Sequence, residues 1–246
     1  MEIVVCVKRV PATDSKIKVA ADGRSIDPAG VEFVLNPYDE FAVEQALLSK
    51  EAAGAGSVTV VTLGGADAQK ELRSTLAMGA DKAVLLDDGG RPRDAHSTAA
   101  AVAAYLKTIP HDLVFCGRQA VDGDDAQFPG RLAAILGLAS VTEVLALELT
   151  DGTLRAERDI EGAREVVTCS LPCVVSTQKG LNEPRSATLK GIMAAKKKPL
   201  EVVPAAAIDP AVEVVSLALP QERQAGRMLG SVDELIGVLK TEAKVL

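Results

Sequence analysis

The sequence predicts an α/β protein organised around a parallel β-sheet. Apolar runs rich in β-branched residues, such as residues 3–7 and 57–63, are typical of strands that are covered on both faces. Segments with helical patterns separate these runs, and glycines or helix-capping residues stand at the boundaries. Strands and helices that alternate in this way form parallel sheets with right-handed crossover connections.

The first half of the chain supplies most of these elements. The first helix has the clearest start, because Asn36 suits the N-cap, Pro37 suits the first turn and Asp39 suits the positive end of the helix dipole. Before it, residues 16–27 predict a short hairpin that turns at Asp22-Gly23. The expected strands are 3–7, 57–63, 83–86 and 112–116, and the expected helices are 36–53, 66–78, 95–107 and 127–136.

After residue 137 the pattern changes. Four strand-like runs at 141–149, 153–159, 164–170 and 173–177 predict an antiparallel extension of the sheet. From residue 181 onward prolines separate short irregular segments, which is typical of an arm that packs on a partner and not of a compact core. The last stretch, 231–240, predicts an amphipathic helix.

The composition narrows the classes of function. A net charge of −7 over 246 residues argues against general nucleic-acid binding, which needs a basic face. The apolar runs are too short to span a bilayer, and the sequence opens directly on a strand pattern, so no secretory signal is expected. Four cysteines without a Cys-x-x-Cys pair disfavour a zinc site and fit free thiols in a reducing, cytoplasmic compartment. Because aromatic residues are scarce, a cofactor would be held by backbone and polar groups or shared with another chain.

The strongest candidate site is the segment 117–130, which follows a parallel strand and precedes a helix. Ligands bind beyond the carboxyl ends of such strands, and a helix start favours phosphate. Gly117, Gly123 and Gly130 would let the backbone turn or approach a ligand, and Gln127 could donate a hydrogen bond. The alternative is a plain helix entry, with Asp124 or an adjacent aspartate as the cap.

Three acids in this loop are unfavourable for phosphate and suit ribose hydroxyls or a structural hydrogen-bond network better. The loop matches neither Gly-x-Gly-x-x-Gly nor a Walker A motif, so a standard dinucleotide or ATPase site is disfavoured. Strand ends at residues 6–10 and 63–67 point to the same edge of the sheet, and residues 36–39 are expected to close over it. Neither histidine has the neighbours of a catalytic base, so no catalytic residue is expected.

The segment 181–198 is unlike a buried strand or helix. It opens on a loop-forming Asn-Glu-Pro, presents Leu189 among polar neighbours and ends in three lysines. A hydrophobic anchor beside positive charge is typical of a surface loop that docks onto a partner. The lysines would steer that partner if it were acidic.

Nearly the whole chain resembles the β subunit of electron transfer flavoproteins. Five blocks carry the resemblance in the right order, namely residues 6–11, 36–39, 76–81, 117–130 and 182–198, of which the last is nearly diagnostic. The resemblance implies a heterodimer with an α subunit that holds the redox-active FAD. It also implies three parts: a Rossmann-like nucleotide-binding domain (adenine nucleotide alpha hydrolase-like) at 1–180, a partner recognition loop at 181–200, and at 201–246 an arm and helix that pack on the α subunit.

The resemblance also assigns sites by position. The docking anchor for acyl-CoA dehydrogenases falls on Leu189, and Ile192, Met193, Lys196 and Lys197 would complete the docking surface. No metal site is implied. The nucleotide contacts would fall on Cys6, Asn36, Pro37, Tyr38, Asp39, Leu63, Gly117, Arg118, Gln119, Ala120, Val121, Asp122, Gly123, Asp124, Asp125, Ala126, Gln127 and Phe128.

Two nucleotides are compatible with this resemblance. The ordinary branch of the family holds a structural AMP here, and the electron-bifurcating branch holds a second FAD and oxidises NADH. The segment 122–127 is similar to the bifurcating pattern, but Asp125 replaces a threonine, and a carboxylate beside a pyrophosphate disfavours FAD. We therefore expect AMP and an electron carrier without bond chemistry of its own. A third hypothesis, a stand-alone adenine-nucleotide-binding protein, leaves the long arm without a function.

Overall fold

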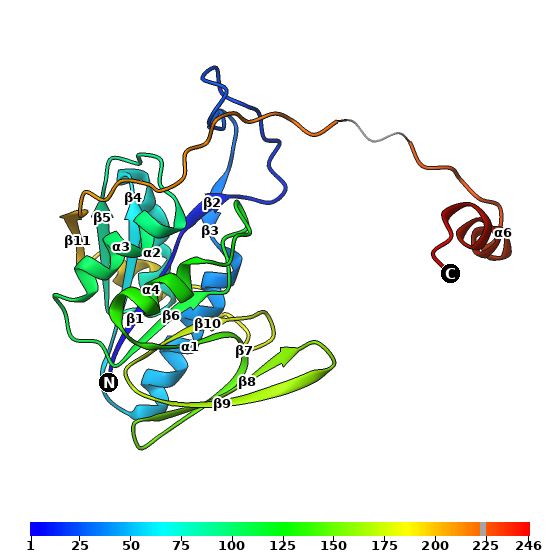
Figure 1. Ribbon diagram of the computed structural model, residues 1–246. Coiled ribbons are helices and arrows are strands. Elements are labelled where there is room, and N and C mark those ends of the chain that lie inside the picture. Colours follow the sequence, from blue (N-terminus) through cyan, green and yellow to red (C-terminus); the bar gives the residue numbers. More distant parts are fainter. Residues whose placement is uncertain (222–224) are drawn as a thin grey trace.

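The computed structural model describes residues 1–221 and 225–246, which form one large sheet with helices on both faces and a C-terminal arm (Figure 1). The strands are β1 (Glu2–Cys6), β2 (Arg9–Pro11), β3 (Phe33–Leu35), β4 (Ser57–Gly64), β5 (Lys82–Asp87), β6 (Leu113–Gly117), β7 (Ala139–Thr150), β8 (Thr153–Ile160), β9 (Ala163–Ser170), β10 (Cys173–Thr177) and β11 (Leu200–Pro204). The helices are α1 (Pro37–Ala53), α2 (Gln69–Met78), α3 (Ala95–Leu106), α4 (Phe128–Leu136), α5 (Leu189–Ala195) and α6 (Val232–Val238), with short helical turns η1 (Ala66–Ala68) and η2 (Leu239–Ala243).

The nine-stranded sheet has the order β11-β5-β4-β1-β6-β10-β7-β8-β9. Every neighbouring pair from β11 to β7 is parallel, and β8 and β9 continue the sheet in antiparallel fashion. The predicted α/β class and the antiparallel extension are therefore both confirmed. The carboxyl ends of the parallel strands share one edge of the sheet, where ligand sites of this architecture lie.

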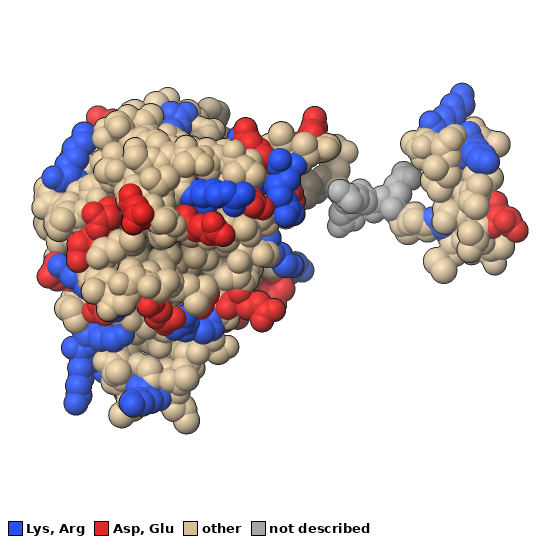
Figure 2. Space-filling model, turned by 90° about the horizontal axis from the view of Figure 1, so that it is seen from below, with Lys and Arg blue, Asp and Glu red and all other residues tan. Residues whose placement is uncertain are grey.

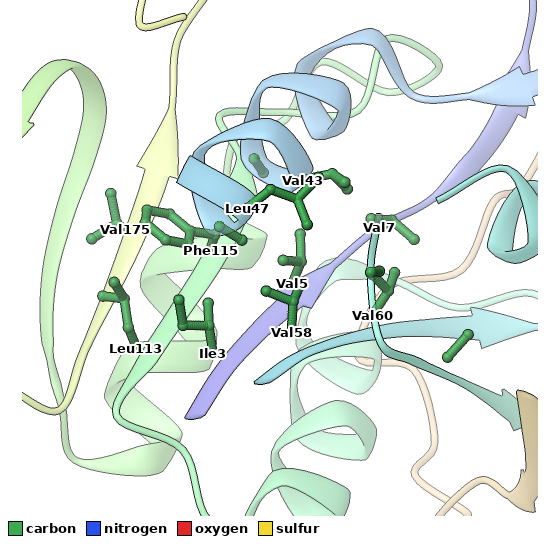
Figure 3. Packing of buried hydrophobic residues seen from close by; sticks show 14 of the residues in the cluster. Ile3, Val5, Val7, Val43, Leu47, Val58, Val60, Leu113, Phe115 and Val175 are labelled. Carbon is green, nitrogen blue, oxygen red and sulfur yellow. The ribbon is translucent and has the colours of Figure 1, made fainter. Parts of the chain in front are cut away.

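Alternation along β1 divides the core into two layers. Ile3 and Val5 face α1 and α2, where they pack with side chains such as Val43 and Leu47 (Figure 3). Val4 and Cys6 face the opposite layer, formed by α3 and α4. Because successive side chains of a strand point to opposite faces, a strand covered on both sides is apolar throughout. Each fully buried Val, Leu or Phe contributes about 1.5–3 kcal/mol.

The structure corrects the predicted place of two strands. We expected 173–177 in the antiparallel extension, but β10 lies between β6 and β7 and is parallel to both. We expected an irregular arm from residue 181 onward, but β11 pairs in parallel with β5 at the edge of the sheet. Both strands are only five residues long, and nothing in their own residues specifies which strand they pair with.

Smaller elements also differ from the sequence prediction. The predicted hairpin at 16–27 is present as a single antiparallel bridge between Val19 and Ile26. The short antiparallel pair β2–β3, which was not predicted, extends the chain beyond β1. It brings the start of α1 back to the carboxyl edge of the sheet.

The arm begins after β11 and passes along the body before it leaves it. Leu217 donates a backbone hydrogen bond to Gly23 O, and Glu213 pairs with Arg24 at 2.9 Å. The C-terminal segment with α6 stands apart from the sheet and its helices, and Figure 2 shows basic and acidic side chains interspersed over the body. None of the residues of α6 is buried.

Residues 1–221 and 225–246 contain neither a candidate membrane-spanning helix nor a candidate metal-binding cluster. None of the helices in these ranges has the length and apolar character that a membrane crossing requires. Nor do the His, Cys, Asp and Glu side chains there form a group of three or more that could hold a metal ion.

Candidate functional site

A pocket of about 590 Å³ opens at the carboxyl edge of the sheet, between the ends of β1, β4 and β6. Its volume lies within the range of small-molecule and cofactor sites. Twelve of the predicted nucleotide contacts line it: Cys6, Asn36, Asp39, Leu63, Gly117, Gln119, Ala120, Asp122, Gly123, Asp125, Ala126 and Phe128. The structure thus gathers residues from four separate segments of the sequence at one place.

Asp39 is the polar centre of the pocket floor. One carboxylate oxygen accepts a hydrogen bond from the backbone N–H of Lys8 at 2.7 Å, and the other accepts from Asn36 Nδ2 at 2.9 Å and from the N–H of Gly117 at 3.1 Å. These bonds join the end of β1, the start of α1 and the end of β6. Burial raises the pKa of Asp39 to about 7, while the hydrogen bonds from Asn36, Lys8 and Gly117 oppose that rise.

Asn36 occupies the N-cap position of α1 but does not cap it with its side chain. Its amide nitrogen donates to Gln119 O at 2.9 Å, and its amide oxygen accepts from the N–H of Val121 at 3.1 Å. Asn36 therefore stands at the N-cap position as predicted, but its side chain does not bind the free N–H groups of α1. It holds the loop after β6 instead. Asn36 is 1% exposed, so these bonds are shielded from water.

Gly117 is required by close packing against α1. A Cβ atom at this position would lie 2.3 Å from Asp39 Oδ1 and 2.8 Å from the Tyr38 carbonyl carbon. The other two glycines singled out in the loop, Gly123 and Gly130, have open space where a Cβ would stand. Of the three, only Gly117 has a steric reason to be glycine.

The acids of the loop have partners within the protein. Lys8 Nζ lies 2.7 Å from Asp122, and Gln119 Nε2 donates to Asp124 at 2.6 Å. Asp125 accepts a long bond of 3.4 Å from the N–H of Gln127. Because Lys8 pairs with Asp122, the loop repels an anionic ligand less than its three aspartates indicate.

The start of α4 is not capped by a side chain. Gln127 occupies the N-cap position, but its side-chain oxygen accepts from Arg131 at 2.7 Å and 2.9 Å instead. Neither Asp124 nor Asp125 caps the helix, so the plain helix entry considered above is not what the structure contains. Pro129 has no N–H group, so the backbone donors at this helix start are those of Phe128 and Gly130, of which Phe128 lines the pocket.

Six of the predicted contacts do not line this pocket: Pro37, Tyr38, Arg118, Val121, Asp124 and Gln127. Tyr38 faces a separate shallow groove together with Glu143 and Lys179. Arg118 lies 5.9 Å from the centre of the Tyr38 ring and pairs with Glu143 at 3.2 Å. Through this ion pair Arg118 reaches Glu143, which lines the groove together with Tyr38.

Sequence reasoning missed one wall of the pocket, the connection from β5 to α3. It contributes Gly90, Arg91, Arg93 and Asp94. The signal was present, since two aspartates and two glycines follow a predicted strand at the same edge of the sheet. Val214 of the arm also lines the pocket, and the arm's backbone is tied to this wall where Asp94 accepts from two of its N–H groups at 2.9 Å and 3.1 Å.

The predicted docking loop contains a short helix, α5, whose outer side is exposed. Leu189 is 84% exposed, Met193 64% and Ile192 45%. Together with the exposed Lys196 and Lys197 these residues make up the surface that the sequence predicts for docking, called the docking face below. An apolar cluster of this kind bordered by charge is typical of a protein-binding surface.

Comparison with known proteins identifies the family. A family model described as electron transfer flavoprotein domain matches residues 24–208. The electron transfer flavoprotein subunit beta of Bacillus subtilis is 40% identical over 100% of both chains, and that of Bradyrhizobium diazoefficiens is 38% identical over 100% of both. The protein of the same name from Syntrophomonas wolfei is 38% identical over 92% of this chain and 88% of its own. The chain belongs to the family of electron transfer flavoprotein beta subunits.

Proposed function

We propose that this chain is one half of a heterodimer that transfers electrons to or from an acyl-CoA dehydrogenase-type flavoenzyme. The observation that carries the proposal is the docking face, whose three apolar side chains are exposed on a helix that is held to the body through Gly191 and the buried Ala195. Exposed Leu, Ile and Met side chains cost free energy in water unless a partner covers them. The long arm, with further exposed apolar residues, is suited to gripping an α subunit.

The pocket residues fit AMP as a structural ligand. Val61, Leu63 and Val102 offer apolar walls for an adenine base. The uncapped start of α4 and the side chains of Lys8 and Arg91 offer donors to a phosphate. The pocket acids suit ribose hydroxyls, in keeping with a nucleotide that carries one phosphate.

The redox chemistry would be supplied by an FAD held mainly by the α subunit. In this proposal the residues described here perform no bond chemistry. They bind the nucleotide, grip the α subunit and place the flavin partner next to the docked dehydrogenase. All four cysteines are free thiols, which supports a reducing compartment such as the cytoplasm.

A second candidate function is electron bifurcation, in which the pocket binds a second FAD and the heterodimer oxidises NADH. It is favoured by the segment 122–127 and by the extent of the pocket, which continues from Asp122 to Arg91. Asp125 opposes it, because its carboxylate lines the pocket and is not engaged in an ion pair with the residues around it.

The nucleotide content of the co-purified heterodimer separates the two candidates. Denaturing release followed by chromatography should give one FAD and one AMP per heterodimer. Two FAD, together with reduction of the heterodimer by NADH, would establish the bifurcating function instead. A heterodimer that releases one FAD, no AMP and no second FAD would contradict both assignments of the pocket.

Replacing Leu189 tests the docking proposal. Leu189→Ala removes the most exposed apolar anchor, and a hot-spot residue of this kind changes affinity by about tenfold or more. We expect KM for the dehydrogenase to rise by that factor while nucleotide content stays unchanged. Val166→Ala is the control, because Val166 is an exposed apolar residue on β9, at the opposite end of the sheet from β5. Equal transfer by both variants with every candidate dehydrogenase would refute docking through this helix.

A further inference from the structure

The helix that carries the docking face is too short to be stable alone. α5 has seven residues, whereas isolated helices shorter than about 12–15 residues are marginal in water. Its order must come from the rest of the protein. The contacts that hold it come largely from α2, the helix that lies beneath it.

Arg73, from α2, caps the carboxyl end of α5. Its Nη1 atom donates to Ala195 O at 2.7 Å and to Lys198 O at 2.9 Å. The last carbonyls of a helix have no partner within the helix, and a cation is the most favourable group to bind them. Arg73 therefore satisfies acceptors at the end of the docking helix.

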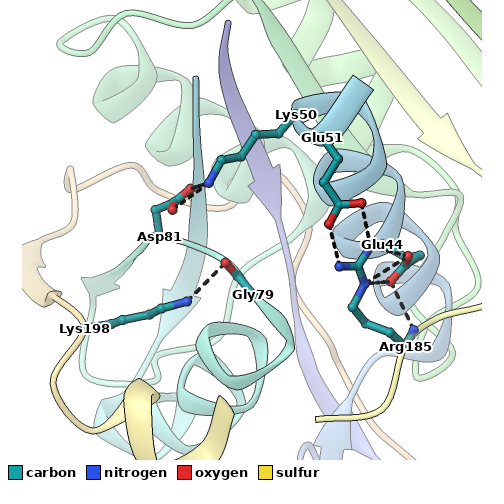
Figure 4. A network of polar contacts seen from close by, with 7 residues as sticks. All are labelled: Glu44, Lys50, Glu51, Gly79, Asp81, Arg185 and Lys198. Carbon is teal, nitrogen blue, oxygen red and sulfur yellow. Dashed lines mark hydrogen bonds and ion pairs between the residues drawn. The ribbon is translucent and has the colours of Figure 1, made fainter. Parts of the chain in front are cut away.

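Lys198, which follows α5, caps the carboxyl end of α2 in return. Its Nζ atom donates to Leu76 O at 3.1 Å, to Gly79 O at 3.1 Å and to Ala80 O at 2.6 Å. Figure 4 shows the bond to Gly79. Three carbonyl partners use all three ammonium donors. Burial lowers the pKa of Lys198, as expected for an ammonium group drawn out of water.

The two helices also touch directly. A Cβ atom on Gly191 would lie 2.4 Å from Ala77 O, so the backbone of α5 rests on the backbone of α2. Ala195 is 3% exposed and joins the core beside α2. Gly191 and Ala195 therefore face α2, and Leu189, Ile192 and Met193 are exposed.

A separate anchor holds the chain before α5. The Arg185 guanidinium pairs with Glu44 at 2.8 Å and with Glu51 at 2.7 Å, both on α1 (Figure 4). This clamp is independent of Arg73 and Lys198. The segment would stay attached to the body if the caps between α2 and α5 were lost, but the helix would lose its fixed end.

We propose that Arg73 and Lys198, which cap each other's helices, are positioning residues that hold the docking face in the conformation a partner binds. Neither residue belongs to the docking face itself. The inference rests on the proposed docking function of α5. Because a preordered surface loses less conformational entropy on binding, the two caps contribute to affinity without touching the partner.

Lysine substitution gives a matched test within one segment. Lys198→Met removes the three carbonyl bonds, whereas Lys197→Met changes the adjacent lysine, whose side chain is exposed. Hydrogen exchange of the α5 amides is measured in the purified heterodimer without any dehydrogenase. Because the lost bonds tie the chain just after α5 to the end of α2, their removal should lower the protection of α5 by about tenfold or more in Lys198→Met, and Lys197→Met should leave it unchanged.

Arg73 provides the second variant. Arg73→Met should lower the protection of α5 as Lys198→Met does, and Arg73→Lys, which keeps the charge, should restore part of it. Lys198→Met and Arg73→Met should each raise KM for the dehydrogenase by about the factor by which the protection of α5 falls, with kcat at saturation unchanged. A general loss of folding would instead lower kcat and the protection of the central strands.

The outcomes separate this inference from the proposed function. If α5 keeps its protection in Lys198→Met and Arg73→Met, or loses it with an unchanged KM, the positioning role is overturned. The docking function is not, provided that Leu189→Ala weakens docking. If Leu189→Ala itself leaves electron transfer unaffected, docking through α5 fails, and the positioning role fails with it.

Discussion

The floor of the pocket and the base of the docking helix each depend on one charged side chain that makes three hydrogen bonds. The two charges have opposite signs. At the pocket, the Asp39 carboxylate accepts three hydrogen bonds, from Lys8 N, Gly117 N and Asn36 Nδ2. At the docking helix, the Lys198 ammonium donates three, all to backbone carbonyls. Asp39 thereby joins the end of β1, the start of α1 and the end of β6, whereas Lys198 joins the segment after α5 to the end of one helix, α2.

The two charges respond differently to pH because burial favours the neutral form of each. Burial raises the pKa of Asp39 to about 7 and lowers the pKa of Lys198 from a value of 10.5. The Asp39 charge therefore changes within the physiological range. The pocket is therefore a region whose order should depend on pH near neutrality.

The largest effect should come from removing the anion. Asp39→Ala leaves three buried donors without an acceptor, each of which costs about 1–3 kcal/mol, offset in part by the lost desolvation of the carboxylate. We expect the free energy of unfolding to fall by about 2–4 kcal/mol and the pocket to lose its nucleotide. Urea unfolding measures the first effect. Asp14→Ala, at an exposed aspartate, should change neither quantity.

Stability should fall as pH rises through the range set by Asp39. The pKa of Asp39 is about 7 in the folded protein and near 3.8 when unfolded, so the folded protein binds more protons between these values. The free energy of unfolding should therefore decrease between about pH 4 and pH 7, by at most about 1.4 kcal/mol per pH unit.

The matched variant for this pH dependence is Asp39→Asn, which cannot titrate. It should be less stable than the native protein at low pH, because its amide N–H faces the N–H of Lys8. Urea unfolding at pH 5, 6 and 7 should show a slope in the native protein and a flat response in the variant. Parallel slopes in the two proteins would assign the titration to another group.

Gly117 tests whether the pocket floor depends on close packing. Gly117→Ala places a methyl group 2.3 Å from Asp39 Oδ1, so the start of α1 must move. Overpacking of this kind costs about 1–3 kcal/mol. Gly123→Ala, in open space on the same loop, should leave the urea midpoint nearly unchanged. If the two variants lose equal stability, close packing of Gly117 against α1 does not determine the stability of the pocket floor.

The smallest effect is expected at the rim of the docking face. Lys196 and Lys197 are exposed, and exposed charges contribute about 0.2–1 kcal/mol to a contact. The double change to Gln should lower kcat/KM for the dehydrogenase at low salt, and the loss should disappear as ionic strength rises. A loss that is the same at every salt concentration would mean that these lysines act through direct contacts instead.

The sequence was sufficient where local patterns determine structure. The strands β1, β4, β5 and β6 were predicted because an apolar run between helices has few alternatives in an α/β protein. The positions of β10 and β11 could not be predicted, since pairing depends on which edges remain open after the other strands have assembled. For the same reason α5 was expected as a loop: only its contacts with α2 make seven residues helical.

The candidate site shows the same division. The loop after β6 follows from its place between a strand and a helix, but the partners of Asn36 and Gly117 lie about 80 residues away and cannot be read locally. Lys198 looked like one member of an exposed lysine run. Its buried role depends on the carbonyls at the end of α2, which no pattern in residues 196–198 reveals.

The position of β10 has a consequence for synthesis on the ribosome. β6 and β7 are complete in the growing chain well before residue 173, yet neither pairs with the other, because β10 must enter between them. Until then each presents an open strand edge, and open edges are sites of pairing with other chains. Chains that stall or are cut between residues 150 and 172 should therefore aggregate, whereas chains cut after β11 retain a closed centre of the sheet.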